Sequence, residues 1–221
     1  MRSDRIGLPG VSASATPQPD QLSADEVLDI HIPLSIAENI ITAATPLGGR
    51  VLDPFAGYGT TLLACENLGR DAVGVELLPE HVRISTARAP RSQVIEGDSR
   101  GLYRLVEGPF DLCFTAPPFL TRNEHPTDPL TGYELIGGDY ASYIAALTRI
   151  TSQVDALLSP GGFLILNVAN IRFQGQTTRL AWDIAAAVDD VVPFISESVI
   201  VWDKLPHDFT GDYMLTFQKP A

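Results

Sequence analysis

Apolar residues along this chain alternate between short runs and helix-like spacings, which predicts strands that alternate with helices. Short apolar runs bounded by turn residues are typical of buried strands, whereas apolar positions three and four apart are typical of helices. The expected strands are Arg50–Asp53, Ala72–Glu76, Gln93–Glu96, Asp111–Thr115, Phe163–Val168, Glu197–Trp202 and Tyr213–Gln218. The expected helices lie at about residues 23–30, 35–45, 60–68, 79–89, 140–158 and 178–188.

Capping and breaking residues support these helix boundaries. The segments Ser23–Glu26 and Ser35–Glu38 have the Ser-x-x-Glu spacing of an N-terminal capping box. Pro79 stands at a first-turn position, where proline is favoured, and Gly69 is expected to stop the preceding helix. Pro160–Gly162 is expected to end the long helix before the next strand begins.

Strands that alternate with helices form units with parallel strands covered on both faces. The last two strands follow one another without a helix, so we expect them to pair as an antiparallel hairpin. The predicted fold is therefore α/β, a Rossmann-like, seven-stranded, mostly parallel sheet with a terminal antiparallel hairpin and helices on both faces. Residues 1–22, rich in Ser, Pro, Ala and Gly, are expected to be a mobile tail, and residues 23–221 a single domain.

Composition narrows the class of protein. Of the 221 residues, 45% are hydrophobic, yet no apolar run approaches the roughly 18 residues of a membrane span. No signal peptide is apparent, so we expect a cytoplasmic protein with no membrane partner. Cys65 and Cys113 lie within a predicted helix and a predicted strand, where a buried thiol is the expected role, and no metal site is expected.

Charge argues against a protein that binds a long stretch of duplex. The chain has 27 acidic and 15 basic residues, which gives a formal charge of −12. Lys204 and Lys219 are the only lysines, and the arginines are scattered rather than clustered. Proteins that hold phosphate backbones usually have a basic face, so only a local basic groove is compatible with this composition.

A glycine-rich turn follows the first expected strand. In the segment Asp53–Thr61, DPFAGYGTT, small residues allow a sharp turn and a close approach of a ligand to the main chain. The helix beyond Gly59 presents free N–H groups that suit an anionic group such as a carboxylate. Leu62 stands where a dinucleotide fingerprint has its third glycine, and the Gly-Lys pair of a phosphate-binding loop is missing.

Two carboxylates follow at the ends of the next two strands. Glu76 is placed to accept hydrogen bonds from the hydroxyls of a ribose, although a helix cap would also explain it. Asp98, in the string Glu96-Gly97-Asp98-Ser99, is placed to accept from the amino group of an adenine, or is a plain turn residue. Carboxyl ends of parallel strands meet at one sheet edge, so the three segments together predict a nucleoside-shaped ligand.

A proline-rich turn, Thr115-Ala116-Pro117-Pro118-Phe119, ends the fourth expected strand. Prolines lack backbone donors and stiffen the turn, so carbonyl oxygens can point into a pocket. Such oxygens would accept hydrogens from an amino group, orient its lone pair and stabilise positive charge that develops on its nitrogen. Phe119 suits stacking on a flat substrate; the alternative is a rigid turn with Phe119 in the core.

These motifs resemble the amino-methyltransferases of DNA, the N4-cytosine and N6-adenine enzymes. The resemblance implies S-adenosylmethionine as cofactor, with the methionine end at Asp53, Phe55, Gly57, Gly59 and Thr60 and the adenosine end at Glu76, Leu77 and Asp98. The other cofactor-binding residues expected from the same segments are His31, Pro33, Pro54, Ala56, Thr61 and Ser99. The resemblance also implies that residues 23–221 are the catalytic domain.

One position departs from the family pattern. Ala116 stands where the family has Asp, Asn or Ser, so this side chain offers no acceptor. Thr115 or water would supply the missing oxygen, or catalysis on a nucleobase is impaired. The order in which the glycine-rich and proline-rich turns occur along the chain does not identify the base that would be methylated. The substrate channel is expected in the loop 120–138, with Arg122, Asn123, His125 and Tyr133 as candidates, and His207 and Asp208 are ambiguous.

The leading hypothesis is an enzyme that methylates an exocyclic amino group of a nucleobase, in DNA or RNA. The alternatives are a small-molecule or peptide N-methyltransferase, which the acidic charge favours, and a non-catalytic cofactor-binding subunit, which Ala116 favours. No segment is large enough for a sequence-reading domain, so a homodimer or a separate recognition subunit is the expected form of any further partner.

Overall fold

The computed structural model describes residues 11–13, 32–122, 130, 139–203, 205 and 209–221. Its strands are β1 (Val11–Ala13), β2 (Arg50–Asp53), β3 (Asp71–Glu76), β4 (Gln93–Glu96), β5 (Phe110–Thr115), β6 (Leu158–Phe173), β7 (Gln176–Thr178), β8 (Phe194–Trp202) and β9 (Phe209–Gln218). Its helices are α1 (Leu34–Ala44), α2 (Thr60–Leu68), α3 (Pro79–Arg88), the 3₁₀ helix η2 (Ser99–Arg104), α4 (Tyr140–Leu157) and α5 (Leu180–Asp189).

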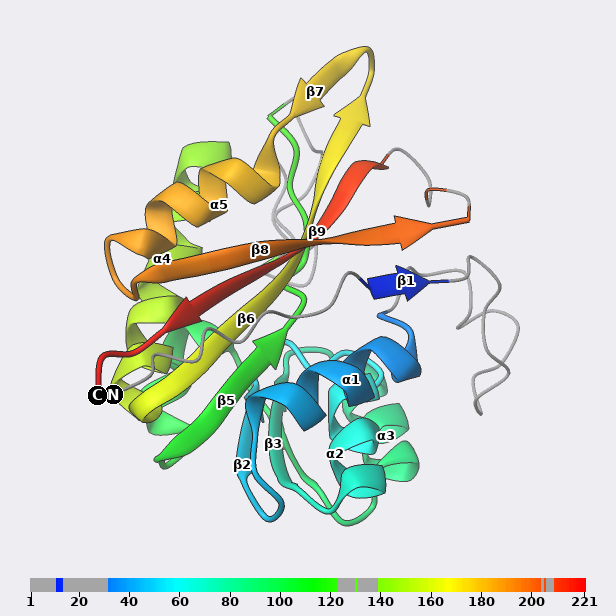
Figure 1. The fold of residues 1–221 in the computed structure, drawn as a ribbon, viewed down its shortest axis with the longest axis vertical. Coiled ribbons are helices and arrows are strands. Elements are labelled where there is room, and N and C mark those ends of the chain that lie inside the picture. The colour runs from blue at the N-terminus through cyan, green and yellow to red at the C-terminus, as the bar shows by residue number, and fades with distance from the viewer. Residues whose placement is uncertain (1–10, 14–31, 123–129, 131–138, 204, 206–208) are drawn as a thin grey trace.

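The strands form one sheet in the order β1-β8-β9-β6-β5-β2-β3-β4, with β7 paired to β6 (Figure 1). Strands β4, β3, β2, β5 and β6 are parallel to one another. Strand β9 is antiparallel to both β6 and β8, so it is the reversed strand of the expected terminal hairpin. From β2 the chain runs outward to β3 and β4, whereas β5 and β6 lie on the other side, so the strand order reverses between β2 and β5.

Both faces of the sheet are buried at its central strands β2 and β5, as expected for parallel strands covered by helices. Val51 packs in a core cluster with residues of α1 and α2, whereas its neighbour Leu52 packs in a cluster with residues of α4 and α5. Successive strand residues point to opposite faces, so an apolar residue is needed at every position. Cys65 and Cys113 are free and buried, as expected, and burial raises the pKa of the Cys65 thiol to about 12.

The structure confirms the α/β fold and all seven expected strands. Five expected helices are confirmed within about two residues, and the helix expected at 23–30 lies outside the described residues. Three elements are additional, namely β1, β7 and η2. Strand β1 lies in the segment expected to be a tail and pairs in parallel with β8.

The bounds predicted for the strand Phe163–Val168 are wrong, because β6 extends from Leu158 to Phe173. Its beginning lies beside Phe110, and Pro160–Gly162 lies within the strand, where the pairing with β5 shifts register. Its end continues as far as β9 and β7 provide partners. Strand length is set here by distant partners, which local apolar patterning does not reveal.

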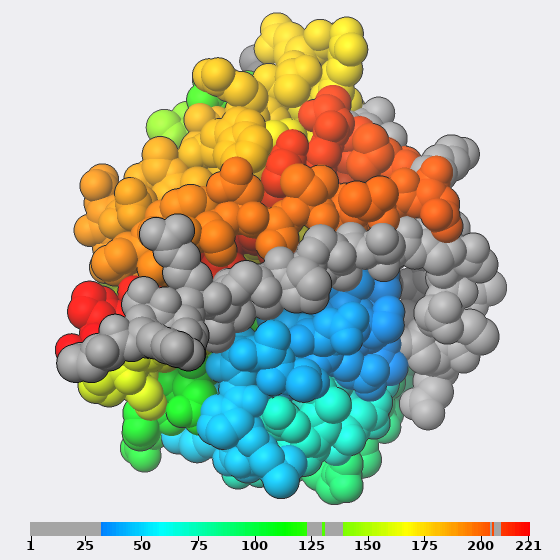
Figure 2. Space-filling view, in the orientation of Figure 1, coloured from blue at the N-terminus to red at the C-terminus, as the bar shows by residue number. Residues whose placement is uncertain are grey.

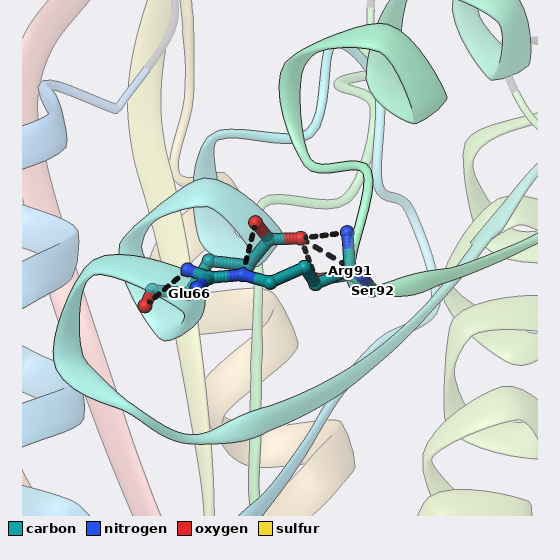
Figure 3. Close-up of polar contacts among 3 residues, drawn as sticks. All are labelled: Glu66, Arg91 and Ser92. Carbon is teal, nitrogen blue, oxygen red and sulfur yellow. Dashed lines mark hydrogen bonds and ion pairs between the residues drawn. The ribbon is translucent and has the colours of Figure 1, made fainter.

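A buried carboxylate fixes the turn between α3 and β4 to helix α2 (Figure 3). Glu66 Oε1 accepts hydrogen bonds from the backbone N–H groups of Arg91 and Ser92 at 2.6 and 2.7 Å. Its Oε2 accepts from Arg91 Nε at 3.1 Å. The contact holds the start of β4, the strand that leads to Asp98.

Candidate active site

A cleft opens at the carboxyl ends of β2, β3, β4 and β5, with about 740 Å³ of empty space including its open mouth. It lies where the strand order reverses, which is where open α/β sheets bind their ligands. The lining residues are Pro54, Phe55, Gly57, Glu76, Leu77, Leu78, His81, Gly97, Asp98, Ser99, Arg100, Ala116, Pro118, Leu130 and Ile150. Residues from four strand ends therefore share one cavity.

The glycine-rich turn after β2 needs glycine at two positions. Gly57 and Gly59 have φ values of 50° and 80°, in the left-handed region that other residues rarely adopt. A Cβ at Gly59 would also lie 2.4 Å from Ser85 Oγ in helix α3. The buried Arg88, also in α3, donates a hydrogen bond to the carbonyl of Tyr58. Helix α3 thus packs directly on the turn and holds its shape.

Glu76, at the end of β3, is tied to the same turn. Its Oε2 accepts from the N–H of Gly57 and its Oε1 from the N–H of Leu78, both at 2.8 Å. Burial alone would raise the pKa of Glu76, but hydrogen bonds from His81, Leu78 and Gly57 outweigh it and leave the pKa below its ordinary value. The side chain is therefore a fixed carboxylate facing the cleft.

His81 was not expected from the sequence. It lies in the first turn of α3, lines the cleft, and places Nδ1 3.7 Å from Glu76 Oε1. Its ring also lies 4.5 Å from that of Tyr58, centroid to centroid. Its position in the sequence could have indicated this, because the first helical turn after a parallel strand borders the same sheet edge as the end of that strand.

Asp98, at the end of β4, lines the cleft and pairs with Arg100, a second residue not expected from the sequence. Arg100 Nε lies 2.8 Å from Asp98 Oδ2, and the N–H of Arg100 donates to Oδ1 at 2.9 Å. Burial acts to raise the pKa of Asp98, but the hydrogen bonds from Arg100 outweigh it and lower that pKa. Ser99 is buried and donates to the carbonyl of Pro54, which joins this strand end to the glycine-rich turn.

Asp53 and Thr115 join the ends of β2 and β5 beneath the cleft. Thr115 Oγ1 donates to Asp53 Oδ1 at 2.6 Å, and the N–H of Phe55 donates to the same oxygen at 3.0 Å. Both side chains are buried, and burial raises the pKa of Asp53 to about 6 against the hydrogen bonds that lower it. Neither residue lines the cleft, so Thr115 does not supply the acceptor that Ala116 lacks.

In the proline-rich turn, Ala116 and Pro118 line the cleft. The carbonyl of Pro118 accepts a 2.6 Å hydrogen bond from the hydroxyl of Tyr143, a buried residue of α4. Phe119 packs edge-on against Phe209 with ring centroids 5.7 Å apart. The turn is thus held from both sides, and stacking of Phe119 on a substrate stays a prediction.

Nine of the expected site residues line the cleft: Pro54, Phe55, Gly57, Glu76, Leu77, Asp98, Ser99, Ala116 and Pro118. Nine others do not line it: Pro33, Asp53, Ala56, Gly59, Thr60, Thr61, Thr115, Pro117 and Phe119. His31 lies outside the described residues, as do Asn123, His125, Tyr133, His207 and Asp208. Of the expected channel residues, Arg122 is described, and its guanidinium pairs with Asp183 at 2.8 Å.

Among the described residues, no group of three His, Cys, Asp or Glu side chains is placed to hold a metal ion. Nor is any helix in the described part of the chain long and apolar enough to cross a membrane.

The sheet order, the reversed strand β9 and the cleft at the strand ends define a Rossmann-like methyltransferase fold. TrmN from Thermus thermophilus has this fold, with a TM-score of 0.63 and 18% identity over 85% of this chain and 49% of that one. A putative rRNA-methylase from Clostridium thermocellum has a TM-score of 0.60 and 13% identity, over 86% of this chain and 99% of that one. At such identities the likeness establishes the fold.

Sequence similarity points to one group within this fold. Residues 13–87 match the family model of the N6/N4 methyltransferases, described as DNA methylase. The type II methyltransferase M.SmaI of Serratia marcescens is 41% identical over 59 residues, which cover 27% of this chain and 20% of that protein. M.XycI of Xanthomonas campestris pv. cyanopsidis is 43% identical over 74 residues, which cover 34% and 23%.

The chain therefore spans about a fifth of the length of these curated relatives. The resemblance to the DNA amino-methyltransferases is confirmed for residues 13–87, which contain the glycine-rich turn and Glu76.

Proposed function

We propose that this chain is an S-adenosylmethionine-dependent N-methyltransferase that acts on an exocyclic amino group of a nucleobase in DNA. One observation carries the proposal: Glu76, Asp98 and the Ala116–Pro118 turn line a single cleft. Its glycine-rich turn belongs to the segment that matches the DNA methylases. We further propose that residues 23–221 act as one catalytic domain.

The donor set of the cleft fits the nucleoside part of this cofactor. Glu76 Oε2 accepts the N–H of Gly57 and has a second lone pair that can accept from a ribose hydroxyl, whereas Oε1 accepts the N–H of Leu78 and lies 3.7 Å from His81 Nδ1. Asp98 and Leu77 line the same cleft, and we assign the adenine amino group to the oxygens of Asp98, which it would share with Arg100. Phe55 and Gly57 line the cleft from the glycine-rich turn, and we assign the methionine end to that side.

When bound, the cofactor supplies an electrophilic methyl group on a sulfonium centre. The chain itself has to hold the acceptor nitrogen in line and stabilise the positive charge that develops on it. Tyr143 donates to the carbonyl of Pro118, so we assign the acceptor role to the carbonyl of Ala116, which lines the cleft. Pro117 and Pro118 have no N–H, so at these two positions the turn offers the amino group acceptors without a competing donor.

A screen of labelled methyl transfer tests the proposal. Purified protein and methyl-labelled cofactor are incubated with duplex DNA, RNA, free nucleosides and a metabolite extract. We expect label on the exocyclic nitrogen of a base in DNA, and loss of the transfer in Glu76→Gln. Label on RNA would overturn the choice of DNA, and label on small molecules alone would overturn the nucleic-acid substrate. Calorimetry that showed no cofactor binding would overturn the whole proposal.

A further inference from the structure

A two-stranded ribbon extends from the sheet beside the proline-rich turn. Thr115, the last residue of β5, pairs with Leu166, whereas β6 continues to Phe173 and turns back into the antiparallel strand β7. Figure 1 shows the β6–β7 ribbon rising beyond the rest of the sheet, and in Figure 2 it forms a knob at the top of the molecule. The ribbon therefore begins at the edge of the sheet where the cleft opens.

The tip of the ribbon is a tight turn of two residues. Gln174 and Gly175 both have positive φ, at 47° and 80°, which is the pattern of a type I′ hairpin turn. Gly, Asn and Asp favour this turn, so Gln174 adopts a backbone conformation that is strained for its residue type. Gln174 is exposed, so the tip of the ribbon presents a polar amide to solvent.

The charges of the ribbon differ from those of the whole chain. No acidic residue occurs between Asp155 and Asp183, and the charged residues in that interval are Arg172 and Arg179. Both arginines are exposed, and neither forms an ion pair with another described residue. The neighbouring Arg122 is already paired with Asp183. The ribbon is thus a local basic surface on a chain with a formal charge of −12.

We propose that the β6–β7 ribbon is a nucleic-acid contact that seats duplex DNA against the edge of the sheet where the cleft opens. Arg172 and Arg179 contact backbone phosphates, and the amides of Gln174 and Gln176 face the base edges. A two-stranded ribbon fits the major groove of duplex DNA, and phosphate contacts supply affinity without a large basic face. This inference rests on the proposed function and names the surface through which its substrate is held.

The test removes the two charges of the ribbon in the full chain, as Arg172→Gln with Arg179→Gln. Binding of a fluorescent duplex of about 30 base pairs is followed by anisotropy between about 50 and 200 mM salt. We expect affinity to fall on the order of tenfold and the salt slope to drop by about 2, as for two lost phosphate contacts. Cofactor affinity by calorimetry and the melting temperature are expected to stay unchanged.

The matched control is Arg104→Gln with Arg149→Gln, which removes the same charge from exposed positions on η2 and α4. We expect this control to keep most of the affinity and slope. If both double variants weaken binding equally, net charge explains the effect and the ribbon proposal fails. If the ribbon variant binds and methylates duplex DNA like wild type, the ribbon proposal fails while the proposed function stands. Wild-type protein that binds only single-stranded RNA would overturn the ribbon as a duplex DNA contact.

Discussion

The hydroxyl of Tyr143 donates a 2.6 Å hydrogen bond to the carbonyl oxygen of Pro118. Tyr143 lies in α4 and is 2% exposed, so its hydroxyl cannot exchange this partner for water at little cost. The bond fixes the second peptide plane of the proline-rich turn, and with it the direction of the carbonyls before it. Under the proposed function, Tyr143 is a positioning residue for the acceptor amino group.

Replacing Tyr143 with Phe removes the hydroxyl and keeps the ring. We expect kcat for methyl transfer to fall about tenfold, as for the loss of one buried hydrogen bond of about 1.4 kcal/mol, with an unchanged Kd for the cofactor. Tyr140→Phe is the matched control, because its hydroxyl donates to Asp183 at 2.7 Å from the same helix. Equal losses of kcat in both variants would show that the Tyr143 hydroxyl affects kcat through helix α4 and not through the proline-rich turn.

Glu76→Gln tests the role of the fixed carboxylate. The amide retains one acceptor oxygen but loses the charge and one of two acceptor positions, while the N–H groups of Gly57 and Leu78 still need partners. We expect the Kd for S-adenosylmethionine to rise at least about tenfold, since hydrogen bonds to charged groups contribute about 1.5–3 kcal/mol. Calorimetry measures this directly.

Glu80→Gln is the control for that measurement. Glu80 lies four residues after Glu76 and pairs with Arg83 at the exposed surface of α3. The substitution Glu80→Gln therefore removes the same charge outside the cleft. An unchanged cofactor Kd in Glu76→Gln, or an equal rise in Glu80→Gln, would contradict the assignment of Glu76.

Residues such as Gly57, Glu76 and Asp98 were predictable because their role depends on position at a strand end. The topology of an α/β sheet brings successive carboxyl ends together, so the sequence order of strands is enough to place them at one edge. Thr115 shows the limit of this reasoning. Its place at a strand end was predicted, but its hydroxyl turns beneath the cleft to Asp53, a direction that depends on the pairing of β5 with β2.

The ribbon and Tyr143 were not predictable for a related reason. The length of β6 is set by its pairing with β9 and β7, and Tyr143 reaches Pro118 across 25 positions of sequence. Neither interaction leaves a local pattern. Arg100 and His81 lie in the first turns of η2 and α3, so their direction toward the cleft depends on helix geometry and not on residue type.

Asp53 gives the fold a dependence on pH that can be isolated. Burial raises its pKa to about 6 from 3.8, so the folded state binds the proton more tightly than the unfolded state does. The contribution of this group to stability is present below pH 3.8 and is lost as pH rises through about 6. The ionised form of Asp53 is tolerated in the folded protein because Thr115 and the N–H of Phe55 donate hydrogen bonds to it.

We therefore expect Asp53→Asn to gain stability relative to wild type as pH rises from about 4 to about 7, by about 2 kcal/mol. Denaturant unfolding of both proteins across this range measures the difference, and taking the difference cancels the titration of the other carboxylates. A constant difference between the two proteins would show that Asp53 titrates with an ordinary pKa.

Ala116 makes the most specific prediction about the reaction. Ala116 lines the cleft at the position where the resembling enzymes have a side-chain acceptor, and Thr115 does not replace that acceptor. Ala116→Ser adds a hydroxyl oxygen that can accept from the substrate amino group, and we expect kcat on duplex DNA to rise about tenfold. Ala116→Val adds bulk without an acceptor, so its rate is expected to stay at or below that of wild type. A Ser variant no faster than wild type would show that the backbone carbonyls of the turn are sufficient, and that the missing side chain does not limit transfer.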